Sequence, residues 1–257
     1  GLTVISASST LECTTFKTGD AMSAQPLDYL TALRAGRWFS SIPDAMQSAL
    51  LADAQFKSLT PQQILFSRGD AFDGIYCVVK GALRITASTA SGKEALLTVV
   101  EPYNWIGEIA LFDGLERTHD AIATHASLVL NVPQASLDKM LKENPEWWRW
   151  FGLLLTYKMR FVFVAIEDAA VLTASQRVAR RLVFMAEGYG EFTDRSRRVL
   201  PLPQDQLAAM LSLSRQTINQ VLRQFEAQGL LKLNYRELEL LDINGLRDAG
   251  RESSASG

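Results

Sequence analysis

The sequence predicts an α+β protein with three parts: an antiparallel, jelly-roll-like strand domain, one long helix, and a C-terminal winged helix-turn-helix domain. Three observations support this fold class. Short alternating strands broken by glycine-containing turns fill residues 58–132, a helical pattern covers 144–172, and two short helices precede two short strands in 204–242. At 257 residues the chain is long for one compact core, so two domains are expected.

The strand domain follows a short helical segment. Residues 1–27 are rich in Ser, Thr and Ala without apolar periodicity, which predicts a flexible arm. Residues 28–56 are typical of two short helices interrupted at Pro43. The short strand segments that follow are separated by glycine-containing turns, as in a barrel or jelly roll, and they are ILFSRGD, GIYCVVKG, ALRITAS, EALLTVV and SLVLNVP.

The long helix is expected to begin at Asn144, which is suited to cap it, with Pro145 in its first turn. Charged residues interrupt it too often for a membrane span. A stripe of apolar residues, spaced alternately four and three apart, predicts a seam with a parallel partner helix. A core helix of a monomer is the alternative. The stripe consists of Leu155, Met159, Val162, Ile166 and Ala169.

The segment GEIALFDGLERTHD, residues 107–120, interrupts the strands and combines groups that suit a phosphodiester attached to a ribose. Backbone amides near Gly107 and the guanidinium of Arg117, beside the Thr118 hydroxyl, can donate to anionic oxygens. The Glu108 carboxylate can accept from a sugar hydroxyl. A buried salt bridge between Arg117 and Glu108 that stabilises a loop is the alternative.

The C-terminal part, residues 173–248, begins with a helix capped by Thr173 and continues to a helix-turn-helix and a wing. Ser214 is expected to cap the second helix of the motif and Gly229 to end it. The side chains left facing outward near its start can reach DNA bases or phosphates. They are Ser214, Arg215, Gln216, Thr217, Asn219 and Gln220. A winged helix that binds protein instead of DNA is the alternative.

Taken together, the strand series, the segment GEIALFDGLERT, the long helix and SRQTINQVLRQFEAQGLL resemble the Crp/Fnr family of bacterial transcription regulators. The resemblance covers about residues 28–245. It implies a cyclic-nucleotide-binding-like β-roll effector domain over 28–143, a dimerisation helix over 144–172, and a DNA-binding domain over 173–248. A disordered tail is expected over 249–257. The resemblance also implies a homodimer, a palindromic double-stranded DNA target, and RNA polymerase as a further partner.

By resemblance, the segment from Gly107 to Thr118 corresponds to the family's phosphate-binding cassette, although it is one residue shorter. The adenine-contacting hydroxyl residues of cyclic-AMP-binding members correspond to Val162 and Phe163, which cannot hydrogen-bond a base through their side chains. The effector is therefore left open between cyclic AMP, cyclic GMP, another small anion and none. The implied effector-binding residues are Gly107, Glu108, Ile109, Ala110, Arg117, Thr118, Val162 and Phe163.

Other functional classes find little support in the sequence. Two cysteines are too few for a disulfide framework or a cysteine-ligated zinc site, and no secretion signal is seen, so a cytoplasmic protein is expected. No activated nucleophile accompanies the carboxylates of 107–120, so no enzymatic activity is expected. The alternatives kept open are a cyclic-nucleotide-binding module that regulates a protein partner without DNA, and a haem or redox sensor that uses His119 or His125.

Overall fold

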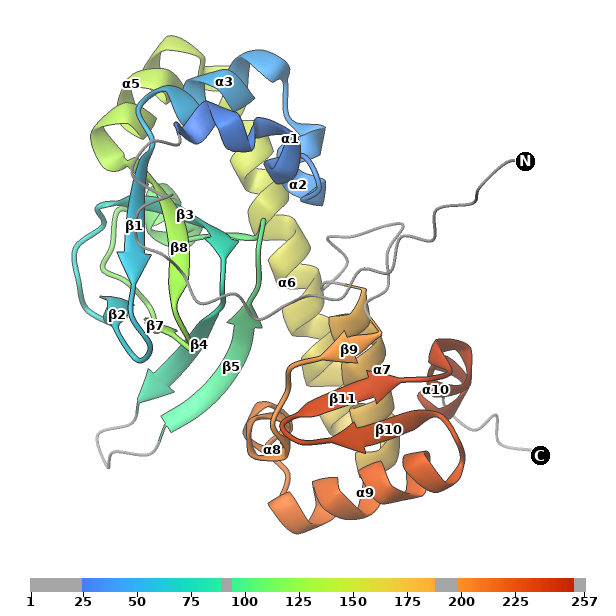
Figure 1. Ribbon diagram of the computed structural model, residues 1–257. Coiled ribbons are helices and arrows are strands. Elements are labelled where there is room, and N and C mark those ends of the chain that lie inside the picture. Colours follow the sequence, from blue (N-terminus) through green and yellow to red (C-terminus); the bar gives the residue numbers. More distant parts are fainter. Residues whose placement is uncertain (1–24, 89–93, 188–197, 252–257) are drawn as a thin grey trace, which may run out of the picture.

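A computed structural model describes residues 25–88, 94–187 and 198–251, and the expected N-terminal arm lies almost entirely outside these residues. The chain forms a β-roll, a long helix and a C-terminal domain, as the sequence predicts (Figure 1). The long helix, α6, runs from the β-roll to the C-terminal domain and connects the two. No helix in the described part of the chain is both long and apolar enough to cross a membrane.

The N-terminal helices cover one end of the β-roll, where they pack with α5 and the start of α6 (Figure 1). Pro43 separates α2 from α3, as expected, because a proline disfavours helical backbone in the residue before it. Trp38 is central to this layer: its ring packs against Trp105 and Phe151, and its indole nitrogen donates to the Trp150 carbonyl. The helices are η2 (Pro26–Tyr29), α1 (Leu30–Leu33), α2 (Arg37–Ser41), α3 (Asp44–Ala52) and α5 (Gln134–Glu143).

The β-roll consists of two four-stranded antiparallel sheets, with strand orders β1-β8-β3-β6 and β2-β7-β4-β5. Strand β3 is buried over almost its whole length because one side faces the helices and the other faces the interior of the roll. The strands are β1 (Gln55–Leu59), β2 (Ile64–Phe66), β3 (Gly74–Lys80), β4 (Leu83–Ser88), β5 (Glu94–Val100), β6 (Trp105–Ile106), β7 (Asp120–Ala123) and β8 (Ser127–Pro133). A short helix, α4 (Glu108–Asp113), interrupts them between β6 and β7.

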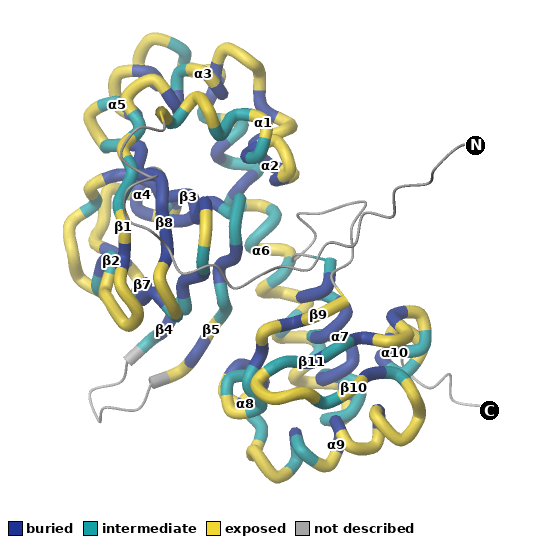
Figure 2. The backbone as a smooth tube through the Cα atoms, in the orientation of Figure 1, coloured by how far each residue is buried: buried dark blue, intermediate teal, exposed yellow. Residues whose placement is uncertain are grey.

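The long helix begins differently from the expectation. A 3-10 turn, η3 (Pro145–Trp147), precedes α6 (Trp148–Val171), and the Asn144 side chain does not cap it. Instead the Asn144 amide donates to the Met140 carbonyl at the end of α5, which leaves α6 to continue directly from the 3-10 turn. Along its C-terminal half, α6 exposes apolar side chains on the surface of the chain (Figure 2).

The C-terminal domain is a winged helix built around one apolar cluster. Thr173 forms the expected capping box with Gln176 at the start of α7. Residues 188–197 are outside the described residues, and β9 pairs with the wing strand β11. The elements are α7 (Ala174–Ala186), β9 (Val199–Leu200), α8 (Gln204–Leu211), α9 (Arg215–Ala227), β10 (Leu231–Asn234), β11 (Glu237–Leu240) and α10 (Ile243–Ala249). Gly250 is buried and its carbonyl accepts from Arg180, so the domain reaches past the end expected at 248.

Among the described residues, the C-terminal domain contacts both the β-roll and the long helix. Leu96 of β5 is 9% exposed and belongs to the apolar cluster of the C-terminal domain, where β5 meets α8. Phe161 of α6 stacks on Phe184 of α7, with ring centroids 4.7 Å apart. Both contacts lie close to the helix-turn-helix, so its position depends on α6 and on the β-roll.

Candidate effector site and nucleic-acid interface

The segment between β6 and β7 has the compact form that its sequence predicts. Gly107 has a φ of 97°, in the left-handed region, and α4 starts directly after it without a side-chain cap. A Cβ atom at Gly107 would lie 2.5 Å from Nη1 of Arg117. Only glycine therefore fits here, both for its backbone conformation and for the close approach of the guanidinium.

Arg117 is 4% exposed and lies inside the β-roll, where three aromatic rings surround it. Its guanidinium carbon is 4.4 Å from the ring centroid of Phe66, 5.0 Å from that of Phe72 and 5.6 Å from that of Tyr76. Its Nη2 donates to the Gly74 carbonyl, and Nη1 donates to the Gly107 carbonyl. Its buried Nε has no hydrogen-bond partner among the described residues.

The ion-pair partner of Arg117 is Asp73, at the start of β3. Nη2 of Arg117 lies 2.5 Å from Oδ1 of Asp73, and the Tyr76 hydroxyl donates to the other carboxylate oxygen. Burial opposes ionisation of this carboxyl, but the bonds from Tyr76 and Arg117 outweigh burial and hold the pKa of Asp73 below its usual value. Burial and the bond to Asp73 raise the pKa of Tyr76. In this structure the Asp73 carboxylate therefore acts as a resident anion, that is, it occupies the position beside the Arg117 guanidinium that an anionic ligand would otherwise take.

Glu108 is paired with a residue of the long helix. Its side chain is 2% exposed, and its Oε2 lies 2.6 Å from Nζ of Lys158 in α6. The same ammonium donates to the Trp105 carbonyl at 2.7 Å. The alternative of an Arg117–Glu108 salt bridge is therefore wrong, because each residue is paired with a different partner. Lys158 links the cassette directly to α6.

We expect Lys158→Met to destabilise the protein by about 2 kcal/mol, because the Glu108 carboxylate would stay buried without its cation. Adding Glu108→Gln should restore most of this loss, since the neutral amide needs no counterion. Urea unfolding of the two single variants and the double variant measures the coupling between the residues. Strict additivity of the three free energies of unfolding would contradict this role of Lys158.

The other expected effector residues are spread over the cassette and α6. Ile109 is 40% exposed, whereas Ala110 is buried, and the Thr118 hydroxyl is hydrogen-bonded to the His119 ring. Val162 and Phe163 are 44% and 62% exposed on α6. Neither makes a hydrogen bond through its side chain, so the structure adds no base-recognising group at these two positions.

The two histidines lie beside threonines. His119 and His125 each share a hydrogen bond of 2.8 Å with the preceding threonine. Burial and the charge of Arg68 lower the pKa of His119. Within the described ranges, no group of three or more His, Cys, Asp or Glu side chains could hold a metal ion.

The helix-turn-helix consists of α8 and α9, with the turn at Ser212 in the left-handed conformation. Ser214 caps α9 as expected, by accepting from the Thr217 amide, and its hydroxyl also bonds the Thr217 hydroxyl at 2.8 Å. Gly229 follows the helix with a φ of 73°. Ile218 and Val221 are buried in the domain core, which leaves the opposite side of α9 on the surface.

The exposed side of α9 forms a polar groove with the start of α8. Its lining residues are Gln204, Arg215, Gln216, Asn219, Gln220 and Arg223. Arg215, Gln216 and Gln220 are exposed, whereas Asn219 is half-buried and donates to the Gln204 side chain at 3.0 Å. Gln204 and Arg223 were not among the residues predicted from the sequence to contact DNA. Arg223 lies on the same helix face two turns after Gln216, a spacing that could have identified it.

Comparisons with known proteins agree with this architecture. Residues 56–144 match the model of the cyclic nucleotide-binding domain, and residues 176–249 match that of the Crp-like helix-turn-helix domain. The CRP-like cAMP-activated global transcriptional regulator of Mycobacterium tuberculosis is 25% identical over 85% of this chain and 97% of its own. The transcriptional regulator SdrP of Thermus thermophilus is 27% identical over 68% of this chain and 83% of its own.

Among solved structures, FixK2 from Bradyrhizobium japonicum is similar with a TM-score of 0.68 at 20% identity, over 78% of this chain and 99% of that one. At this identity the likeness concerns the fold, and it extends over most of both chains. With two family domains in order along one chain and regulators as relatives over most of its length, the protein belongs to the Crp/Fnr family of transcription regulators.

Proposed function

We propose that this protein is a homodimeric regulator that binds a palindromic double-stranded DNA site through α9 and responds to a small anionic effector in the β-roll. The exposed groove on α9 is the observation that carries the DNA-binding part. It combines arginine and amide side chains near the N-terminal end of a helix in a winged helix-turn-helix, where such helices enter the major groove.

The residues of this groove have the chemistry of base recognition. Arg215 can donate two hydrogen bonds to guanine, and Gln216 and Gln220 can each form a donor and acceptor pair with adenine. Asn219 is held by Gln204, so it would either orient Gln204 or change partner on binding DNA. Ser214 and Thr217, at the first turn of α9, would contact phosphate.

Dimerisation through α6 would cover its exposed apolar stripe. Met159, Val162 and Ile166 are 43%, 44% and 60% exposed in the single chain, and Ala169 is also exposed. Leu155 lies half-buried at the start of the same stripe. A row of this length is costly to leave in water, and a parallel second copy of α6 would present the same residues to it.

An anionic effector is supported by the unused donor of Arg117. Buried polar atoms normally have partners, and Nε of Arg117 has none among the described residues. An incoming anion would accept from Nε or replace Asp73, and Glu108 and Thr118 are the groups expected to contact a ribose or a further oxygen. The M. tuberculosis relative is named as cAMP-activated, yet Val162 and Phe163 offer a base no side-chain hydrogen bond. Any nucleotide would have to be recognised through its phosphate and sugar.

RNA polymerase completes the proposal as a partner at the promoter. A regulator bound to DNA acts on transcription by contacting the polymerase or by blocking it. The exposed surface of the β-roll is available for such a contact.

Binding-site selection from random duplexes tests the DNA-binding proposal. The selected consensus should be an inverted repeat with half-site centres one helical turn, about 34 Å, apart. Arg215→Ala should weaken binding by about 1–3 kcal/mol per half-site and remove the preference at one base pair. Arg149→Ala, the same change at an exposed site at the far end of α6, is the control and should keep the consensus. Recovery of no palindrome, or one unchanged by Arg215→Ala, would show that α9 does not read DNA.

A further inference from the structure

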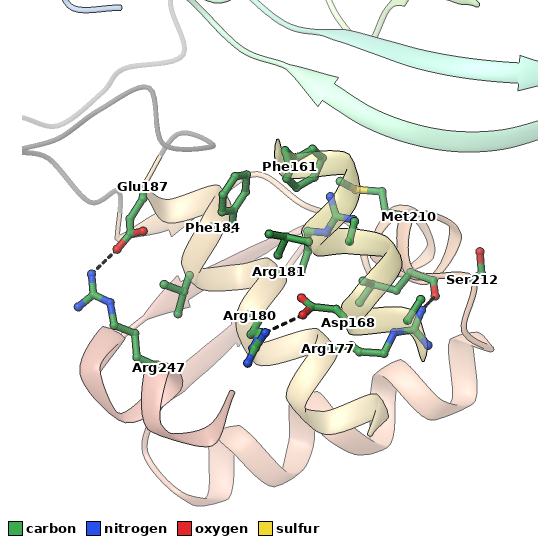
Figure 3. A pocket seen from close by; sticks show the side chains of 15 residues that line it. Phe161, Asp168, Arg177, Arg180, Arg181, Phe184, Glu187, Met210, Ser212 and Arg247 are labelled. Atoms are coloured by element: carbon green, nitrogen blue, oxygen red, sulfur yellow. Dashed lines mark hydrogen bonds and ion pairs between the residues drawn. The ribbon is translucent and has the colours of Figure 1, made fainter. Parts of the chain in front are cut away.

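A cavity of about 340 Å³ lies where the long helix meets the C-terminal domain, far along the chain from the cassette (Figure 3). Its walls come from the C-terminal half of α6, from α7, from the end of α8, and from Arg247 of α10. A volume of about 300 Å³ or more is typical of sites for small organic molecules. The cavity therefore has room for one such ligand.

The apolar part of the cavity is formed mainly by aromatic and aliphatic side chains. The rings of Phe161 and Phe184 stack on each other at one end, beside Met210 (Figure 3). Val164 and Ala165 of α6 continue this surface. A flat or extended hydrocarbon group would be removed from water there.

The polar part carries an excess of positive charge. Four arginines line the cavity but only two carboxylates, and the residues are Arg177, Arg180, Arg181, Arg247, Asp168 and Glu187. Both carboxylates are already paired, because Asp168 lies 2.6 Å from Arg180 and Glu187 forms an ion pair with Arg247. The lining therefore favours a ligand that brings a negative charge of its own.

Arg177 is the arginine best placed to hold that charge. Within the described part of the chain its side chain makes one hydrogen bond, from Nη2 to the Leu211 carbonyl, and no ion pair. A guanidinium has five N–H donors, so most of them remain available. Arg177 lies near Asp168 at the end of the cavity away from the two stacked rings (Figure 3).

Most of the α6 residues that line the cavity lie on a different side of this helix from the proposed dimer seam, and Ala169, at the end of the seam, borders both surfaces. Successive helical residues turn by about 100°, which places Phe161, Ala165 and Asp168 roughly 80–140° around the helix from the seam centre near Val162 and Ile166. A second copy of α6 on the seam would therefore leave this side of the helix open. The partner helix is not the occupant that the cavity fits best.

We infer that this cavity binds one small amphipathic anion, with a carboxylate, sulfonate or similar head group at Arg177 and an apolar body against Phe161, Phe184 and Met210. This site is separate from the cassette around Arg117, and its ligand needs neither a ribose nor a phosphodiester. Its walls include both α6 and the end of α8, the helix that precedes α9, so an occupant contacts the long helix and the helix-turn-helix at once.

Fluorescence titration with two related dyes tests the inference. Anilinonaphthalene sulfonate has the proposed head group and body, whereas phenylnaphthylamine has similar rings without the sulfonate. The sulfonate should bind once per chain and at least about tenfold more tightly than the neutral dye, because it gains a charge-assisted hydrogen bond.

Arg177→Gln should weaken the binding of the sulfonate about tenfold and leave the binding of the neutral dye unchanged, because it removes the positive charge and keeps a polar side chain. Arg160→Gln is the matched control, since Arg160 is exposed on α6 and does not line the cavity. Ala165→Phe should fill the cavity and remove sites for both dyes. Circular dichroism checks that each variant is folded. If Ala165→Phe does not fold, Arg177→Gln still tests the inference.

Three outcomes would overturn the inference. If Arg177→Gln and Arg160→Gln weaken the binding of the sulfonate dye equally, the dye is held only by a general attraction to positive charges on the protein. Undiminished dye binding by a folded Ala165→Phe variant would place the dye elsewhere, such as on the exposed seam. Loss of dye binding as the protein concentration rises into the dimer range would identify a second copy of this chain as the occupant.

Discussion

Val162→Asp is expected to convert the protein from a dimer to a monomer and to abolish specific DNA binding at the same time. In a parallel dimer with two-fold symmetry, Val162 of one chain would lie close to Val162 of the other. The substitution would bring two carboxylates together in an apolar seam, where neither has a counterion. A loss of at least about 100-fold in dimer affinity is expected from burying such charges. Light scattering measures the mass, and a mobility-shift assay with the selected duplex measures DNA binding.

The matched control is Val164→Asp. Val164 has nearly the same exposure as Val162, 46% against 44%, and belongs to the same helix. Two positions along, it lies about 200° around α6, on the side opposite the seam. This variant should keep the mass of a dimer. A monomeric wild-type protein at micromolar concentration, or equal masses for the two aspartate variants, would refute the seam.

Arg117→Ala is expected to destabilise the β-roll by about 3 kcal/mol as well as to remove any response to an anionic effector. The side chain fills the space between three aromatic rings, and truncation leaves a cavity there together with unpaired Gly74 and Gly107 carbonyls. Thermal unfolding measures the stability, and calorimetry with cyclic AMP and cyclic GMP measures effector binding. Arg68→Ala, at an exposed arginine near the same loop, is the control and should unfold like the wild type.

The Asp73–Arg117 pair also makes a prediction about acid. Since the pKa of Asp73 is lowered in the folded protein, its ionised form contributes stability that is complete above the usual value of 3.8. That contribution is lost as the pH falls through the lowered pKa. The free energy of unfolding of Asp73→Asn should therefore fall less between neutral and acidic pH than that of the wild type. The same substitution should raise the affinity for an anion that competes with Asp73. If Asp73→Asn leaves both the dependence of stability on acidic pH and the affinity for anions unchanged, Asp73 is not a resident anion for Arg117.

The elements that could be predicted from the sequence are those whose stabilising bonds are local. Thr173 and Gln176 cap each other within one helical turn, Ser214 accepts from an amide three residues away, and Gly229 adopts a left-handed conformation that few other residues tolerate. Short apolar runs bounded by glycine-containing turns likewise identified the main strands of the β-roll, including β3 and β8, which are buried over almost their whole length. The outward-facing side chains of α9 could also be identified from helical periodicity, because Ile218 and Val221 are buried on the opposite face.

The pairing of the charged groups, in contrast, depends on how distant parts of the chain pack together. Arg117 meets Asp73 across 44 residues of chain, and Glu108 meets Lys158 across 50, through the folding of β3 and α6 around the cassette. A pair between Arg117 and Glu108 was one alternative that the sequence left open, because both residues lie in one short segment. The cavity beside Arg177 could not be predicted either, because its walls come from four helices whose packing no local pattern encodes. Local hydrogen bonds and periodicity depend on neighbours in sequence, whereas a binding site depends on the distances that packing sets between distant side chains.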